Sequence, residues 1–236
     1  MTSRDEWMRA ARAAFPHTLP VLTGFAFLGI AYGILMRAQG QGLALTACMS
    51  AIVFAGSMQY LAAPLFALGF APLSAFLLTL MVNARHLFYG ISMLDRLRGT
   101  GKWKNLLIFL MCDETFSLLL NAQPPRGVDR ARFMVCIAVM DYLYWVLASV
   151  AGSLLGAVLT VNVAGIDFVL TALFLVIFLN QWHGRAGRWP AAAGVLCSLL
   201  CLAAFGAEQF MLPAMAAILA ALLIWQSLRT RREAAQ

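Results

Sequence analysis

Three polar side chains that can bind charged groups, Asn83, Arg85 and His86, lie inside one apolar run, residues 72–93. At the centre of a bilayer an arginine costs roughly 2.5–3.5 kcal/mol on insertion scales, so arginines at that depth usually face the protein interior and a partner. On a helix, Asn83 and His86 share one face, whereas Arg85 lies about 200° round from Asn83. Both faces of this segment must therefore be covered by protein. His86 fits either proton transfer or hydrogen-bonded packing.

The nearest acidic candidates, Asp113 and Glu114, lie near the middle of the next apolar run, residues 106–120. We expect the two runs to cross and to form the polar centre of a transport site. Adjacent residues on a helix point about 100° apart, so one carboxylate can pair with Arg85 while the other exchanges protons. Two structural alternatives stay open: an ion pair that only locks the fold, and acidic residues that begin a short helix.

The composition assigns these residues to a membrane protein. Of the 236 residues, 62% are hydrophobic and only 11% are charged, and the mean hydropathy is +0.82. Soluble domains are nearer half apolar. The net charge of +7 comes from short basic clusters between apolar runs, which is typical of cytoplasmic loops rather than of a nucleic-acid surface. We therefore predict an all-α, polytopic integral membrane helix bundle that binds lipid and no nucleic acid.

The apolar pattern predicts one transmembrane domain over residues 1–236, with an interfacial helix at 1–17, a helix bundle at 18–228 and a basic cytoplasmic tail at 229–236. The bundle contains about eight apolar segments: 19–36, 43–68, 72–94, 105–121, 133–159, 166–182, 190–206 and 209–227. Because a span needs about 20 residues, we expect seven or eight spans, and the unequal lengths favour some broken or re-entrant helices.

The distribution of basic residues predicts the topology. Eight simple spans that start from a cytoplasmic N-terminus leave most basic residues inside, which favours cytoplasmic positions for both termini. The loop at 95–104 does not fit, because it is basic and falls outside. It moves inside if the segments at 43–68 and 105–121 are re-entrant, and this alternative stays open.

The second segment is the first candidate for a broken helix. Gly56 is a weak helical residue, and Pro64 lacks an N–H and clashes with the preceding turn. We expect an unwound stretch between Gly56 and Pro64, with Gln59 at the break, because transporters use such breaks to present half-helix ends to substrate. A proline kink filled by a neighbouring helix is the alternative.

The fifth segment carries one acidic residue and a pair of glycines. Gly152 and Gly156 have the same small-x-x-x-small spacing as Gly29 and Gly33 in the first segment, which lets helices approach closely. The sequence does not identify the partner of either pair. Asp141 lies only about two turns into its segment, which favours an interfacial position over a role in coupling.

A weak internal repeat links the third and sixth segments. The pattern Asn-x-x-His occurs at 83–86 and again at 180–183, after a similar apolar run. A separation of three spans would make the two copies an inverted repeat, as in many secondary transporters. Chance is the alternative.

The sequence predicts no metal site and no cofactor. The five cysteines show no Cys-x-x-Cys pair, and the histidines at 17, 86 and 183 lack ligand spacing. No intramembrane aspartyl-protease motif or serine nucleophile elbow is found either, so we assign no catalytic residue and do not expect an enzyme.

Several motifs follow one another along the chain: Pro20–Gly33, Phe54–Gln59, Val82–Gly90 and Asp113–Phe116, continued by Trp145, Gly152, Gly156, Gly165–Phe168 and Phe174. Together they resemble the AzlC family of branched-chain amino-acid permeases. The most specific of them read Asn-Ala-Arg-His and Asp-Glu-Thr-Phe. Asp141 is not part of the family pattern.

The resemblance implies an exporter of leucine, isoleucine and valine, and often methionine, in the bacterial inner membrane, with a small four-span AzlD-type subunit as partner. On this basis Gly56, Gln59, Asn83, Arg85 and His86 are the expected substrate-binding residues. Asp113 and Glu114 are the expected proton-coupling residues. A different small amphipathic substrate, or a membrane subunit that stabilises another protein without transport, is the alternative.

Overall fold

The computed structural model describes residues 3–66, 72–83, 85–158 and 188–234, together with Leu175, Phe178, Leu179 and Trp182. It divides the chain into two compact units, residues 1–169 and 170–236, which are described separately. All regular structure within the described ranges is helical, and no strand occurs there. The part of the protein that the structure describes is therefore all-helical, as the sequence predicts, whereas the single domain over 1–236 stays a prediction.

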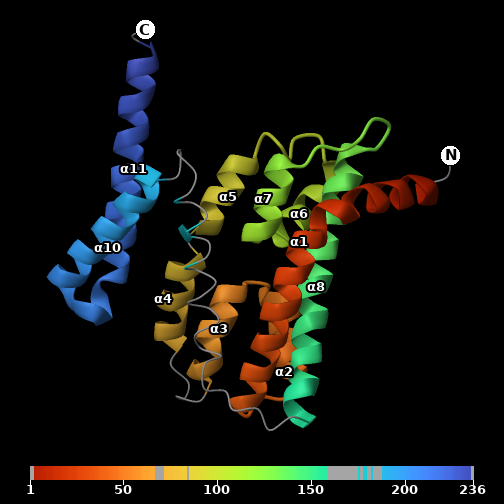
Figure 1. Cartoon of the computed structure of the whole chain (residues 1–236), viewed down its shortest axis with the longest axis horizontal. Helices are drawn as coiled ribbons and strands as arrows, with labels where there is room; N and C mark the ends of the chain where they lie inside the picture. The colour runs from red at the N-terminus through yellow and green to blue at the C-terminus, as the bar shows by residue number, and fades with distance from the viewer. Residues whose placement is uncertain are drawn as a thin grey trace. The chain divides into compact units, whose positions relative to one another are not determined.

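Unit 1 is built on two long helices, α1 (Ser3–Ala38) and α8 (Arg130–Val158), which lie side by side in Figure 1. Their close approach depends on glycines. A Cβ on Gly29 would lie 2.6 Å from Cβ of Ala148, and a Cβ on Gly33 would lie 2.7 Å from the carbonyl carbon of Gly152. The two small-residue patterns found in the sequence are therefore partners of each other.

The N-terminal part of α1 turns away from the remainder of the helix, as Figure 1 shows. Pro16 and Pro20 lie inside α1, and each removes an N–H donor and displaces the preceding turn. The Thr18 hydroxyl donates to the carbonyl of Phe15 at 3.0 Å in this region. The expected interfacial helix at 1–17 is thus the first part of α1, and its location at a membrane surface stays a prediction.

The remainder of unit 1 consists of short helices. They are α2 (Leu43–Cys48), the π-helix η1 (Met49–Val53), α3 (Gly56–Leu65), α4 (Pro72–Asn83), α5 (Arg85–Met93), the 3-10 helix η2 (Gly101–Trp103), α6 (Lys104–Phe109) and α7 (Asp113–Asn121). Figure 1 shows α2 and α3 beside the C-terminal half of α1, and α6 and α7 beside the first half of α8. The segments at 43–68 and 105–121 are therefore each broken into shorter helices, as their sequences indicate.

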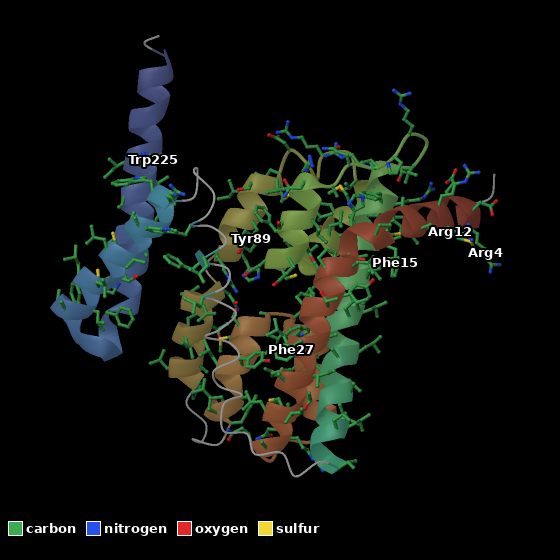
Figure 2. The ribbon with its side chains drawn as sticks, viewed as in Figure 1. Arg4, Arg12, Phe15, Phe27, Tyr89 and Trp225 are labelled. Atoms are coloured by element: carbon green, nitrogen blue, oxygen red, sulfur yellow. The ribbon has the colours of Figure 1, made fainter. Side chains whose placement is uncertain are left out.

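Three basic regions meet at one end of unit 1. Trp7 packs edge-on against Trp103, with ring centroids 5.1 Å apart. Glu6 forms an ion pair with Arg132. The loop after α5 reaches the same end, because Arg130 donates to the carbonyl of residue 96 at 3.0 Å. In Figure 2, Arg4 and Arg12 lie on this N-terminal part of α1.

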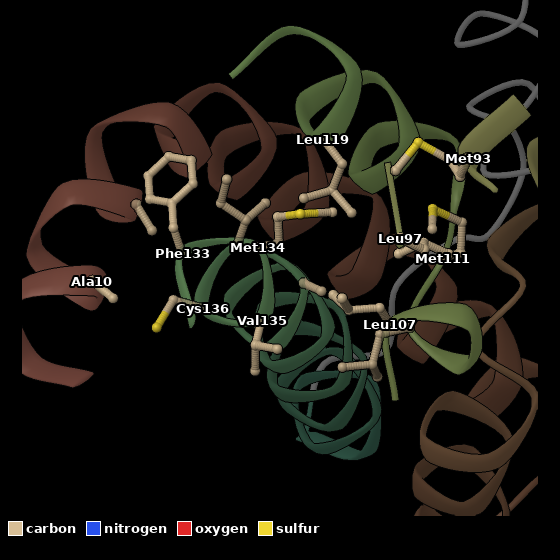
Figure 3. Close-up of a cluster of buried hydrophobic side chains, with 14 residues drawn as sticks. Ala10, Met93, Leu97, Leu107, Met111, Leu119, Phe133, Met134, Val135 and Cys136 are labelled. Carbon is tan, nitrogen blue, oxygen red and sulfur yellow. The ribbon is translucent and has the colours of Figure 1, made fainter. Parts of the chain in front are cut away.

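A buried apolar cluster holds this end together. It combines Ala10 and Ala14 of α1 with side chains from the end of α5 and the loop after it, from α6, α7 and the turn between them, and from the first part of α8. Figure 3 shows its members, including Met93, Leu107, Leu119, Phe133 and Met134. Outside such clusters, many large apolar side chains are exposed, and Phe27 on α1, labelled in Figure 2, is 66% exposed. Exposure of this kind is expected for a surface that faces lipid.

Unit 2 contains α10 (Arg188–Gln209) and α11 (Met211–Ala234), which pack against each other. Gly206 interrupts α10 with a φ of 73°, a conformation that favours glycine. α11 includes residues 229–234, so most of the expected basic tail is helical. The segment at 166–182 lies almost wholly outside the described residues, as do Asn180 and His183.

Three of the described helices are long and apolar enough to cross a membrane: Arg4–Ala38, Arg130–Val158 and Arg188–Gly206. Two shorter apolar helices cover Leu43–Val53 and Ala216–Trp225. Where a segment is broken into two short helices, neither helix alone is long enough to cross a membrane. The predicted count of seven or eight full spans therefore stays a prediction, whereas multiple candidate spans are present.

Candidate functional site

The break in the second segment comes just before α3. Phe54 adopts a left-handed conformation (φ 42°, ψ 45°), Ala55 is non-helical, and α3 begins at Gly56. Left-handed backbone costs a non-glycine residue about 1–2 kcal/mol. Burial of the Phe54 ring, whose centroid lies 5.0 Å from that of the Tyr142 ring, offsets this cost. The first N–H groups of α3 have no partner within the helix.

Our sequence prediction for this break was wrong in its position. Residues 56–65 are helical through Pro64, and Gln59 lies within α3 instead of at an unwound stretch. Gln59 is fully buried and is used for structure. Its side chain donates to the carbonyl of Met49 at 2.7 Å and accepts from Trp145 Nε1 at 2.7 Å. Pro64 is the last residue but one of α3, so it does not end the helix before this turn. The sequence carries no signal for the π-helix η1 that precedes the break.

A second break separates α6 from α7. α6 ends at Phe109 and α7 begins at Asp113, with Cys112 as an extended N-cap. The Cys112 thiol caps the helix by accepting from the main-chain N–H of Thr115 at 3.5 Å. Asp113 and Glu114 therefore lie in the first turn of a short helix, where acidic residues are favoured by the helix dipole. This was one of the two structural alternatives.

Arg85 connects the two breaks. It is the first residue of α5, and its Nη1 lies 2.5 Å from Oδ2 of Asp113, the first residue of α7. Its Nη2 donates to the hydroxyl of Ser57, the second residue of α3, at 2.5 Å. About a third of each charged side chain is exposed, 33% for Arg85 and 30% for Asp113. The starts of three short helices thus meet at one ion pair.

An aromatic residue completes the ligands of Asp113. The Tyr89 hydroxyl donates to Oδ1 of Asp113 at 2.8 Å, so both carboxylate oxygens are engaged. The Tyr89 ring stacks on Phe116, with centroids 4.5 Å apart, and packs edge-on with His86 at 5.3 Å. Figure 2 labels Tyr89 on α5. Sequence analysis missed both Tyr89 and Ser57 as site residues, because neither type is unusual in an apolar helix.

The other two expected binding residues lie next to this pair. His86 Nδ1 is 3.2 Å from the main-chain carbonyl of Asn83, so one ring nitrogen is used locally. Within the described ranges, the buried Oδ1 of Asn83 and the buried Nε of Arg85 have no hydrogen-bond partner. One is an acceptor and the other is a charged donor. These two buried atoms are hydrogen-bonding capacity that the site leaves unsatisfied.

A second, fully buried acidic residue lies behind α7. Asp141 of α8 is 0% exposed, and its Oδ2 accepts from the Thr115 hydroxyl at 2.9 Å. Asp141 is therefore enclosed by protein, whereas its expected interfacial position in the membrane stays a prediction. The position of Asp141 two turns after the start of its apolar run does not give its distance from water, because α6 and α7 cover this part of α8.

No group of His, Cys, Asp and Glu side chains suited to a metal ion occurs among the residues that the structure describes. The chemistry at hand is instead electrostatic. A guanidinium, two carboxylates and the first turns of α3 and α7 lie together, and the N-terminal ends of helices favour anions. The chemistry that such an arrangement can perform is electrostatic binding of a charged solute, without a covalent step.

Comparisons with known proteins agree with this description. A family model described as AzlC protein matches residues 20–159. These residues include α3, α5, α7 and all of α8. No solved structure matches the chain.

Several relatives cover most of the chain. A protein of Bacillus subtilis named "Branched-chain amino acid transport protein AzlC" is 48% identical over 224 residues, which are 95% of this chain and 88% of the relative. An "Uncharacterized membrane protein" of Haemophilus influenzae is 40% identical over 89% of this chain and 86% of the relative. "Inner membrane protein YgaZ" of Escherichia coli is 27% identical over 75% of each chain.

Proposed function

We propose, since this chain belongs to the AzlC family, that it transports branched-chain amino acids across the inner membrane of a bacterium. The family is one of transport proteins and not of enzymes. The observation that carries the proposal is the Arg85–Asp113 ion pair at the starts of α5 and α7. An amino acid carries the same two charges at the same short separation. Its carboxylate can therefore take the place of Asp113 beside Arg85, and its ammonium can take the place of Arg85 beside Asp113.

The exchange is balanced in charge. The substrate carboxylate takes Arg85, whose free Nε and shared Nη2 provide two parallel donors. The substrate ammonium takes Asp113, with Oδ1 of Asn83 as a further acceptor. Neither Arg85 nor Asp113 is then left without a partner. An unpaired charge at a partly buried position would be costly. A solute that lacks either charge cannot open the pair without leaving one partner alone.

The first turn of α3 supports the carboxylate end. Ser57 already contacts Arg85, and the N–H groups near Gly56 belong to a helix start, where anions are favoured. Gly56 itself is limited by packing, because a Cβ there would lie 3.1 Å from the Trp145 ring. We assign the binding role to the main chain at Gly56, whereas Gln59 braces the break and does not contact substrate.

The broken helices favour a topology with six crossings and two re-entrant hairpins. α1, the pair α4 and α5, α8, α10 and α11 would cross the membrane, and the sixth crossing is the one that the sequence alone predicts after α8. α2 to α3 and α6 to α7 would enter from opposite sides and return. The meeting of residues 7 and 103, and of residues 96 and 130, supports this arrangement, because it brings the 95–104 loop to the side of the N-terminus.

This topology resolves the misfit of the basic loop. Both termini and the regions at 96–104, 126–132 and 185–188 then lie in the cytoplasm, and Arg37 is the basic loop residue left outside. It replaces seven or eight full spans by six. Two hairpins that enter from opposite sides also favour an inverted repeat within 43–121, although not the one suggested by Asn180 and His183.

Export and proton coupling are the finer parts of the proposal. Asp113 and Glu114 are the expected coupling residues, and Asp113 is held by Arg85 and Tyr89. We therefore assign Asp113 to substrate and leave Glu114, which follows it in the first turn of α7, for proton exchange. An AzlD-type subunit with four spans is the proposed partner, and support for it comes from the family resemblance alone. A different small amphipathic substrate is the second candidate.

Transport in proteoliposomes tests the proposal. Efflux and uptake of labelled leucine, valine and methionine would be measured for this chain with and without its small partner, under an imposed pH gradient. Movement that follows the gradient supports a proton-coupled transporter, and a requirement for both chains supports the partner. Folded and inserted chains that move none of the three substrates would sink the branched-chain assignment.

A further inference from the structure

The strongest feature that the proposed site leaves unused is Asp141 on α8. Asp141 is 0% exposed, and its Oδ2 accepts a hydrogen bond from the Thr115 hydroxyl at 2.9 Å. Its Oδ1 is buried and has no hydrogen-bond partner among the described residues. Asp141 lies roughly 16 Å from the start of α8 at 1.5 Å per residue, close to the middle of this helix.

The groups that face Asp141 from α7 are acidic or neutral. Glu114 disfavours a charge on Asp141, the Thr115 hydroxyl donates to it, and the Cys112 thiol lies 3.2 Å from that hydroxyl. The nearby cation, Arg85, is held by Asp113. α7 therefore presents the end of a helix dipole and a hydroxyl to Asp141, but no positive side chain.

The other elements around this part of α8 supply no cation either, within the residues that the structure describes. On α1, the Thr18 hydroxyl lies 3.1 Å from the Tyr144 hydroxyl and 3.8 Å from the sulfur of Met140. On η1, the carbonyl of Ala51 accepts from Tyr142 at 3.0 Å. No salt bridge to Asp141 occurs in these ranges.

A buried carboxyl without a cation is held at least cost as the neutral acid, because an unpaired buried charge is strongly disfavoured. Its release of a proton would leave a carboxylate beside the first turn of α7, where the helix dipole and the Thr115 hydroxyl stabilise it. The two charge states of Asp141 therefore favour different positions of α7. The same turn carries Asp113.

We propose that Asp141 is a proton-binding residue of the transport cycle, linked to the Arg85–Asp113 pair through Thr115 and the first turn of α7. This inference rests on the proposed function. Substrate entry separates Asp113 from Arg85 and shifts this turn, and the shift changes the hydrogen bond from Thr115. The O–H bond of the acid then breaks, the proton passes to water, and the carboxylate remains.

The test compares Asp141→Asn with wild type and with Asp95→Asn, which neutralises a carboxylate that is 87% exposed. Proteoliposomes would hold the chain with its small partner if transport requires it. We expect Asp141→Asn to retain leucine counterflow at equal pH within about twofold and to lose accumulation driven by a pH gradient. Asp95→Asn should match wild type in both assays. Gradient-driven accumulation at the wild-type level in Asp141→Asn would overturn the proposal.

A second measurement covers failure of Asp141→Asn to fold and separates the two proposals. Infrared difference spectra between two pH values should contain the C=O band of the protonated Asp141 carboxyl group. In Thr115→Val this band should weaken, or the pH midpoint of its titration should change by about one unit. A band of the same intensity and the same midpoint in Thr115→Val and wild type would contradict the link through Thr115. If the wild-type protein moves no substrate under any gradient, the proposed function is contradicted. If transport is coupled to protons but no carboxylic-acid C=O band is found, only the role of Asp141 is contradicted.

Discussion

The Arg85–Asp113 ion pair is only partly buried, and each side chain keeps about a third of its surface exposed. Fully buried pairs are usually structural, and exposed pairs contribute little. A pair of intermediate burial can be opened at moderate cost. Because the pair joins the first residues of α5 and α7, it can open at the site without unfolding either helix.

The first prediction separates stability from transport at this pair. Arg85→Ala leaves Asp113 without its cation and should lower the free energy of unfolding by about 2 kcal/mol, less than the roughly 3–5 kcal/mol of a fully buried pair. The double variant Arg85→Ala, Asp113→Ala should recover most of that loss, because neither charge is left alone. Both variants should lose transport.

Thermal unfolding in detergent and leucine transport in proteoliposomes check this prediction together. Arg98→Ala is a matched control, since its side chain is 82% exposed and pairs with Asp95 at the surface. A double variant that transports at the wild-type rate would show that the ion pair is only a structural lock.

The second prediction concerns Gln59. Because its two polar ends bond to Met49 and Trp145, Gln59→Ala should leave two buried groups unpaired and destabilise the protein by about 2–4 kcal/mol. We expect a lower Tm in detergent. Unchanged thermal stability with a raised KM for leucine would restore Gln59 to the substrate site.

At the scale of elements, the site depends on helices that stop within the bundle. α3 and α7 are short, and each rests on α8 near its middle, through Gly56 with Trp145 and through Thr115 with Asp141. α8 is in turn fixed to α1 by glycine contacts. A small shift of α8 against α1 would therefore move both helix starts.

The third prediction tests the contact between α1 and α8. A Cβ on Gly152 would lie 2.7 Å from the main-chain Cα of Ile30, and backbone atoms cannot give way cheaply. Gly152→Ala should destabilise the protein by more than about 2 kcal/mol or prevent folding. Gly24→Ala, where no atom lies within 4 Å of the added Cβ, should be neutral or slightly stabilising. Equal stability of the two variants would contradict the packing.

The sequence predicted some of these elements for physical reasons. Burying Arg85 requires an acid, so a contact with Asp113 or Glu114 could be expected. The break at Phe54 could not, because a phenylalanine in a left-handed conformation carries no local signal. The burial of Asp141 also escaped prediction, because it depends on α6 and α7 folding over α8, which no spacing within α8 reveals.

At the scale of the whole molecule, the path of the chain through the membrane is the main inference. The sequence indicated the alternative in which the segments at 43–68 and 105–121 return to the side they came from. Contacts at one end of unit 1 favour that alternative. They could not be predicted, because they join regions more than one segment apart.

The fourth prediction tests this topology. In a variant without native cysteines, Arg98→Cys should react with a membrane-impermeant maleimide from the cytoplasmic side, as Arg12→Cys should. Gln41→Cys, which lies in the loop after α1, should react from the periplasmic side. Labelling of Arg98→Cys from the periplasm would contradict the two re-entrant hairpins and restore simple spans.

The central claim is that a zwitterion opens the Arg85–Asp113 pair, and binding competition tests it most directly. Labelled leucine would be bound to the purified wild-type protein and displaced by leucine, by leucinamide, which lacks the carboxylate, or by 4-methylpentanoate, which lacks the ammonium. We predict that only leucine competes well and that the two analogues are at least about 100-fold weaker, since each leaves one charge unpaired. Competition by either analogue within a few-fold of leucine would contradict the exchange of partners at this site.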